Sequence, residues 1–294
     1  MGCCVIGRRR LLVTGNRQLV TIVCNKDHFL FTAGALWIEA MRHAISSLRR
    51  SDMKGIVLAG GLGSRLYPLT KITNKHLLPI YNKPMIYYPI ETLVEAGIKD
   101  IMIVTGGDHA GNFLRLLGNG HDFGLKGINY AYQEAEGGIA EALSLAEYFA
   151  DGEKIVVILG DNLIEKSIKD DVQKFSGQDK GARILIKEID SPERFGVVEF
   201  DGGKIIGIEE KPKQPKTNYA VTGIYMYDNQ VFDLIKTLEP SARGELEITD
   251  VNNMYLAKGE LEYSKLDGWW TDAGTFESLH HASKLIAERQ REAI

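Results

Sequence analysis

The sequence predicts an α/β fold: a doubly wound, mixed sheet with parallel central strands and a β-rich insertion. Two observations lead to this prediction. From Met53 onward, short apolar runs alternate with segments of helical spacing, a rhythm typical of parallel strands covered by helices. After about residue 190, the apolar runs are separated by turns, which indicates an insertion richer in strands.

The strands of the first half are predicted from apolar runs that end at glycine or polar residues. The clearest is 55–59, Gly-Ile-Val-Leu-Ala, which enters a glycine-rich loop. Helical spacing at 85–96 ends at Gly97, a residue that commonly follows the last turn of a helix. The same reasoning predicts strands at 100–105, 128–133, 154–159 and 183–187, and helices at 108–117, 139–149 and 168–175.

The second half is predicted to begin with strands and end with helices. Its turns are expected at 201–203 and 212–215, which are rich in glycine and proline. The expected strands are 196–200, 204–208 and 219–227, followed by helices at 230–237, 248–258 and 276–288. Because no linker or repeat interrupts the pattern, we expect one domain over 53–294.

Residues 1–52 differ in composition from the rest of the chain. They hold eight Lys and Arg against three Asp and Glu, and all three cysteines. Such a basic segment is compatible with a targeting peptide, and its first residues partly match a lipidation signal that Ile6 breaks. We favour a leader of unknown role, or upstream sequence before a start at Met53, which lies outside the domain at 53–294.

The bulk composition excludes several classes of protein. The net charge of −4 gives no overall electrostatic reason to bind nucleic acid or an anionic membrane. No apolar run reaches the roughly 18–20 residues needed to cross a bilayer. With no cysteine after Cys24, a disulfide framework is absent from the domain and a cytoplasmic location is expected. An anionic ligand must therefore be held by a local cluster of donors.

The loop after the first strand is a candidate phosphate site. Leu58-Ala59-Gly60-Gly61 continues through Gly63 to Arg65, so backbone amides and a guanidinium can face phosphate oxygens. A Walker A loop would need Gly-Lys-Ser/Thr, and a dinucleotide fingerprint would need glycine in place of Leu66. A plain strand-to-helix turn is the alternative. Lys75, close behind in Asn-Lys-His-Leu-Leu-Pro, is a second candidate cation.

Taken together, these motifs resemble the signature of the sugar-nucleotide pyrophosphorylases. The resemblance runs from 53 to about 281 and is closest to the short form of the glucose-1-phosphate thymidylyltransferases. It implies a Rossmann-like fold with a sugar-binding insertion, a homotetramer, Mg2+, and the substrates dTTP and glucose 1-phosphate, as in dTDP-rhamnose biosynthesis. Further matching segments occur in order at 133–142, 159–162, 193–197, 209–212, 221–223, 243–250 and 270–275.

The resemblance also implies roles for individual residues. Arg65, Lys75 and Lys211 would be the catalytic cations. The nucleotide would contact Leu58, Gly60, Gly61, Gln133, Gly138 and Asp161, where the Gln133 carboxamide can pair with thymine or uracil. The sugar would contact Gly196, Glu210, Lys211 and Val221. Phe195 stands where many relatives have tyrosine, so a phenol contact there is lost.

Asp161 and Asp272 are the implied Mg2+ ligands. Asp161 follows a buried strand of an open sheet, and ligands bind at the carboxyl ends of such strands. Mg2+ commonly takes one or two carboxylates together with phosphates. Each aspartate alone could instead cap a turn or a helix. Two other functions remain open, a uridylyltransferase and a non-catalytic relative that senses sugar nucleotides.

Overall fold

The computed structural model describes residues 2–6, 9–16, 19–24, 27–32, 53–61 and 63–292. The chain divides into two compact units, Met1–Ser51 and Asp52–Ile294. In the first unit, four strands pair antiparallel in chain order: β1 (Gly2–Ile6), β2 (Arg9–Asn16), β3 (Leu19–Cys24) and β4 (Asp27–Thr32).

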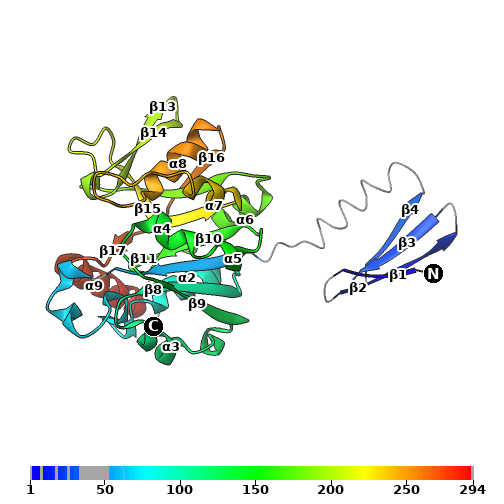
Figure 1. Ribbon diagram of the computed structural model, residues 1–294, viewed down its shortest axis with the longest axis horizontal. Helices are drawn as coiled ribbons and strands as arrows, with labels where there is room; N and C mark the ends of the chain where they lie inside the picture. The colour runs from blue at the N-terminus through cyan, green and yellow to red at the C-terminus, as the bar shows by residue number, and fades with distance from the viewer. Residues whose placement is uncertain are drawn as a thin grey trace. The chain divides into compact units, whose positions relative to one another are not determined.

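The second unit is organised around a nine-stranded mixed sheet (Figure 1). Its central strands run parallel to one another in the order β10 (Ile155–Leu159), β5 (Lys54–Ala59), β8 (Asp100–Gly106) and β9 (Gly127–Gln133). These four strands confirm the predicted parallel core. The apolar runs of β5, β8 and β10 are buried on both faces, as the absence of polar alternation indicates.

The insertion joins this sheet through β15 (Tyr219–Tyr227), which pairs antiparallel with β10. On its other side, β15 pairs with two strands, β12 (Ala182–Glu188) and β13 (Gly196–Asp201). The sheet is completed by β14 (Lys204–Glu210), antiparallel to β13, and by β16 (Leu261–Lys265), parallel to β12. The long strand β15 therefore connects the parallel core to the insertion.

Alternate residues of the central strands feed two separate cores. In β5, Ile56 and Leu58 pack with α4 (Ile139–Ser144), α5 (Glu147–Ala150), α7 (Gln230–Ile235) and α8 (Ile248–Ala257). Val57 and Ala59 face the opposite core, with α2 (Tyr87–Glu95), α3 (Ala110–Leu117) and α6 (Lys169–Gly177). Helices thus cover both faces, which is the doubly wound arrangement expected from the sequence.

Smaller elements complete the fold near the carboxyl ends of the central strands. β11 (Asn162–Ile164) pairs antiparallel with β17 (Trp270–Asp272), and β6 (Pro79–Ile80) pairs with β7 (Lys83–Pro84). The final helix α9 (Phe276–Glu292) packs through Ala282 and Ile286 on Ile80 and Leu163. The sequence did not predict β11, β16 or β17, which are only three to five residues long.

One predicted helix is divided in the structure. The helical pattern at 139–149 corresponds to α4 and α5, which are separated at Leu145 and Ala146. Ala146 leaves helical geometry with φ −92° and ψ 0°. The break still allows Leu143, Phe149 and Ala150 to enter the same core, so the apolar spacing looks continuous in the sequence.

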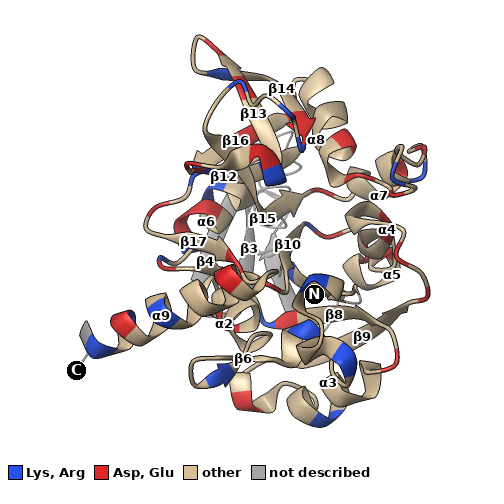
Figure 2. Cartoon of the chain, turned by 90° about the vertical axis from the view of Figure 1, so that its left-hand side faces the viewer, with Lys and Arg blue, Asp and Glu red and all other residues tan. Residues whose placement is uncertain are grey.

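Among the described residues, no helix combines the length and apolar character needed to span a membrane. Lys and Arg lie interspersed with Asp and Glu over the surface of the described elements (Figure 2).

Candidate active site

A cleft of about 420 Å³ opens where the central strands end. Eight of the predicted site residues line this cleft, and they come from the ends of several strands and the loops that follow them. They are Leu58, Gly60, Gly61, Arg65, Lys75, Gln133, Gly138 and Asp161. The parallel strands deliver their carboxyl ends to one edge of the sheet, and this brings together residues about 100 positions apart.

The glycine-rich loop forms one wall of the cleft. Gly61 and Gly63 have φ values of 87° and 64°, a region that side chains rarely adopt. A β-carbon at Gly60 would collide with Oε1 of Gln133, at the end of β9. Glycine is therefore required here both for backbone conformation and for close approach to the neighbouring strand.

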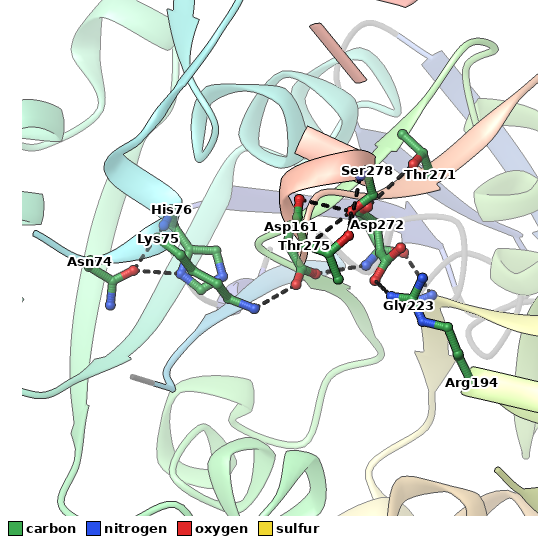
Figure 3. Close-up of polar contacts among 11 residues, drawn as sticks. Asn74, Lys75, His76, Asp161, Arg194, Gly223, Thr271, Asp272, Thr275 and Ser278 are labelled. Atoms are coloured by element: carbon green, nitrogen blue, oxygen red, sulfur yellow. Dashed lines mark hydrogen bonds and ion pairs between the residues drawn. The ribbon is translucent and has the colours of Figure 1, made fainter. Parts of the chain in front are cut away.

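Lys75 is fixed against Asp161 on the floor of the cleft (Figure 3). Its Nζ lies 2.6 Å from Asp161 Oδ2, and both side chains are largely buried. The next residue, His76, is buried and its Nδ1 lies 2.8 Å from Asn74 Oδ1. Burial and the adjacent Lys75 ammonium lower the pKa of His76 to about 3, so this imidazole is neutral at physiological pH.

The strand pair β11–β17 brings the two predicted metal ligands together. Asp272 is directly opposite Asn162, the residue after Asp161, and the Ala273 amide donates to the Asp161 carbonyl at 2.8 Å. Figure 3 shows the two carboxylates in one cluster with Lys75 and Arg194. Asp272 accepts from Arg194 at 3.1 Å, and Gly274 leaves room for the Arg65 guanidinium beside it.

The two carboxylates are held in different electrostatic states. Burial alone would raise the pKa of Asp161, but the charge and hydrogen bond of Lys75 outweigh it and hold that pKa well below its usual range. Burial and the nearby Asp161 charge raise the pKa of Asp272, and Arg194 and Arg65 offset this only in part. Part of the rise in the pKa of Asp272 therefore comes from repulsion between the two carboxylates, which an additional cation would relieve.

The donor set suits a hard divalent cation that takes its remaining ligands from a substrate. Within the described part of the chain, no group of three or more His, Cys, Asp or Glu side chains is placed to hold a metal by itself. Two carboxylates, Asp272 on β17 and Asp161 just before β11, would leave most coordination positions of such a cation open. Phosphate oxygens and water are the partners that Mg2+ usually adds to such a pair.

Asn162 orients Asp161 from behind. Its Nδ2 donates to Asp161 Oδ1 at 3.0 Å, and its Oδ1 accepts from the Trp270 indole at 2.7 Å and the Gly223 amide at 2.9 Å. Trp270 is therefore buried, and its ring packs edge-on against Phe195. It does not offer an exposed face on which a ligand could stack.

The four predicted residues of the insertion lie outside the lining of the cleft. Gly196 is paired with Glu210, and the pairing of Val197 with Ala220 places Gly196 beside Val221. Glu210 accepts from Thr249 Oγ1 at 2.6 Å. Lys211 has a φ of 46° and its side chain is 46% exposed, with Nζ 3.7 Å from Glu210 Oε1.

Two arginines beside the predicted residues were missed by the sequence reasoning. Arg194 pairs with Asp272, and Arg243 lies 3.5 Å from Glu210 Oε1 and 2.8 Å from Glu247 Oε2. Both lie in segments that carry the family resemblance, at 193–197 and 243–250. The sequence alone does not distinguish these two arginines from others, because the carboxylates that they contact are known only from the structure.

A model of the nucleotidyl transferase family matches residues 54–289, which covers the second unit almost completely. The chain belongs to the nucleotidyl transferase family. The match omits the first unit, as the resemblance in the sequence does.

Curated relatives show which members of the nucleotidyl transferase family this chain resembles in sequence. A protein named glucose-1-phosphate thymidylyltransferase from Neisseria meningitidis is 47% identical over 238 residues, 80% of this chain and 82% of that protein. A protein of the same name from Mycolicibacterium smegmatis is 44% identical over the same shares.

Solved structures of similar proteins agree with the sequence comparison. One from Bacillus anthracis, provisionally described as a glucose-1-phosphate thymidylyltransferase in complex with sucrose, is 55% identical with a TM-score of 0.77. It covers 79% of this chain and 94% of that chain. A UDP-glucose pyrophosphorylase complexed with UDP-glucose has a TM-score of 0.71 over 81% of this chain and 99% of that one. At 23% identity, it shows the shared Rossmann-like fold alone.

Proposed function

We propose that this nucleotidyl transferase converts dTTP and glucose 1-phosphate to dTDP-glucose and pyrophosphate. The observation that carries the proposal is the cleft lined by a glycine loop, Arg65, Lys75 and Asp161, with Asp272 brought next to Asp161 by the strand pair β11–β17. Cations beside paired carboxylates suit a triphosphate with a divalent metal. The curated relatives named for this activity support the choice of substrates.

The reaction needs positioning and charge compensation rather than a base. A phosphate oxygen of glucose 1-phosphate attacks the α-phosphorus of dTTP, and pyrophosphate leaves. Because the attacking oxygen is already ionised at neutral pH, repulsion between two anions is the main obstacle. Arg65 and Lys75 reduce this repulsion on the triphosphate, and Lys211 reduces it on the sugar phosphate.

Mg2+ held by Asp161 and Asp272 would supply further positive charge between the phosphates. Lys75 and Arg194 are the ion-pair partners of these carboxylates in the structure. On the nucleotide, Leu58, Gly60 and Gly61 bring the backbone close to the ligand.

In this proposal, one set of residues binds the base and another binds the sugar phosphate. Gln133 and Gly138 recognise the pyrimidine, and Gly196, Glu210, Lys211 and Val221 bind the sugar phosphate. We also propose a homotetramer in a reducing cytoplasm, as the family resemblance implies.

A steady-state assay of pyrophosphate release tests the proposal. The purified chain is offered dTTP, UTP, ATP and GTP, each with several sugar 1-phosphates and Mg2+. We expect the highest kcat/KM with dTTP and glucose 1-phosphate. A higher value with UTP would make the protein a uridylyltransferase, and no release with any pair would favour the non-catalytic alternative.

A further inference from the structure

Glu141 contacts the proposed base-recognition residue from outside the cleft. Gln133 is 8% exposed at the end of β9, and its Nε2 donates a hydrogen bond to Glu141 Oε2 on α4. Gln133 lines the cleft, whereas Glu141 lies behind it and is not one of the lining residues. The other end of the amide, Oε1, lies against Gly60, which does line the cleft.

The position of Glu141 is fixed by the backbone around it. The loop that enters α4 is tied to residue 246 by two bonds, from Leu246 N to Gly137 O at 2.8 Å and from Ala140 N to Leu246 O at 3.2 Å. A β-carbon at Gly137 would come within 3.0 Å of Glu141 Cδ, so this glycine leaves the space the carboxylate occupies. The backbone that carries Glu141 is therefore held close to Gln133, with room for the carboxylate to reach it.

The contact determines which way the Gln133 amide points. A carboxylate offers only acceptors, while a carboxamide has a donor end and an acceptor end. With Nε2 directed at Glu141, Oε1 is the end presented beside Gly60. The reversed amide would place two oxygen acceptors against each other with no hydrogen between them, which is costly at a buried site.

We infer that Glu141 is a positioning residue that makes the base pocket selective for a pyrimidine carrying an N3–H, thymine or uracil, over cytosine. This inference rests on the proposed function. An acceptor at Gln133 Oε1 can take a hydrogen bond from N3–H of thymine or uracil. Cytosine has an unprotonated N3 in the same place, so two acceptors would meet. Glu141 controls this choice without touching the nucleotide.

The test measures nucleotide preference in three variants. Glu141→Met removes the acceptor at similar side-chain length, and Glu141→Gln retains an oxygen that can accept from Gln133. The matched control is Glu147→Met, an exposed glutamate on α5 paired with Lys236. For each protein, kcat/KM is measured with dTTP, UTP and dCTP at saturating glucose 1-phosphate. Calorimetric titration gives the affinities for dTTP and dCTP without sugar.

In Glu141→Met, we expect the dTTP-to-dCTP ratio to fall about tenfold or more, since the amide is free to reverse. The dTTP-to-UTP ratio should be unchanged because both bases carry N3–H, and so should the KM for glucose 1-phosphate. Glu141→Gln should lower the ratio by less than Glu141→Met, because its amide can accept from Gln133 as Glu141 does but can also reverse and donate to it. The control should stay within about twofold, as is usual for exposed positions.

An unchanged dTTP-to-dCTP ratio in Glu141→Met would overturn the inference, and so would an equal loss with all three nucleotides. If that variant does not fold, Glu141→Ala is judged by the same ratio. The parent rate with dTTP and glucose 1-phosphate tests the proposed function separately. The calorimetric preference, measured without sugar, tests Glu141 even if the sugar is wrongly assigned.

Discussion

On the nucleotide half of the site, Gln133 and Asp161 are each 8% exposed and held by polar partners. On the insertion half, the Lys211 side chain is 46% exposed, and its charged partner is Glu210 at 3.7 Å. The first half is built on the ends of parallel strands, and the second on antiparallel strands at the side of the sheet. The comparison teaches that the fold holds the residues proposed for the nucleotide more tightly than Lys211, which is proposed for the sugar phosphate.

The largest effect is expected at the carboxylate pair. Asp161→Asn or Asp272→Asn removes an anionic ligand and leaves the side-chain size unchanged. Loss of such an electrostatic element lowers kcat by about 100–1000-fold. The double variant should lose little more than either single one, because both residues act through the same ion. A double-mutant cycle across a Mg2+ titration measures this.

The control for the carboxylate pair is Asp233→Asn, an exposed aspartate on α7. It should keep the parent rate, while high Mg2+ should partly restore the single site variants. Melting temperatures should change little in all of them. If Asp272→Asn lost activity only in proportion to lost folded protein, with no dependence on Mg2+, Asp272 would be a structural cap.

The next effect concerns the insertion half. Lys211→Ala should raise the KM for glucose 1-phosphate by about tenfold and leave the KM for dTTP nearly unchanged, because one charged hydrogen bond to the sugar phosphate is lost. Steady-state kinetics with each substrate varied in turn provide the measurement. Lys213→Ala, at an exposed lysine two residues away, is the matched control. Equal effects of the two substitutions would mean that Lys211 is only an exposed turn residue.

A smaller effect tests how well the nucleotide half distinguishes similar bases. Thymine and uracil differ by one methyl group, and a hydrophobic pocket discriminates such a group by about 10–200-fold at most. We therefore expect measurable turnover of UTP beside preferred dTTP, and rejection of purine triphosphates. Competition between dTTP and UTP in one reaction gives the ratio directly. Comparable turnover of ATP would contradict a pocket sized for a single ring.

No effect on catalysis is expected from removing the first unit. The described strands of Met1–Ser51 form a sheet of their own, and the family match begins at residue 54. A chain beginning at Met53 should fold and keep the kcat of the full chain. Circular dichroism and the pyrophosphate-release assay check both points. An insoluble or much slower protein would show that this segment supports the core.

Most of the parallel core could be predicted from sequence because β5, β8 and β10 are apolar along nearly their whole length. Ile155–Leu159 and Lys54–Ala59 need no knowledge of their neighbours to be recognised. The strands β11 and β17 could not, since three residues have no periodicity and are defined by the partner they meet. Their pairing is nevertheless what places Asp272 next to Asp161.

The candidate site, like the fold, could be predicted only in part from the sequence. Glycines, lysines and aspartates in motifs were visible, and eight of the predicted residues line the cleft. The contact between Gln133 and Glu141 was not, because it depends on the direction of two side chains from separate elements. The same holds for Arg194 and Arg243, whose partners lie at other places in the chain.

The buried amide of Asn162 also limits how this protein can be redesigned. A β-carbon at Gly223, in the middle of β15, would lie 2.6–2.7 Å from three atoms of that amide. Because the same amide donates to the Asp161 carboxylate, a single methyl group added on this strand would displace Asn162 and disturb its bond to Asp161. Libraries aimed at new sugar substrates can vary the neighbours of β15, but position 223 must stay without a side chain.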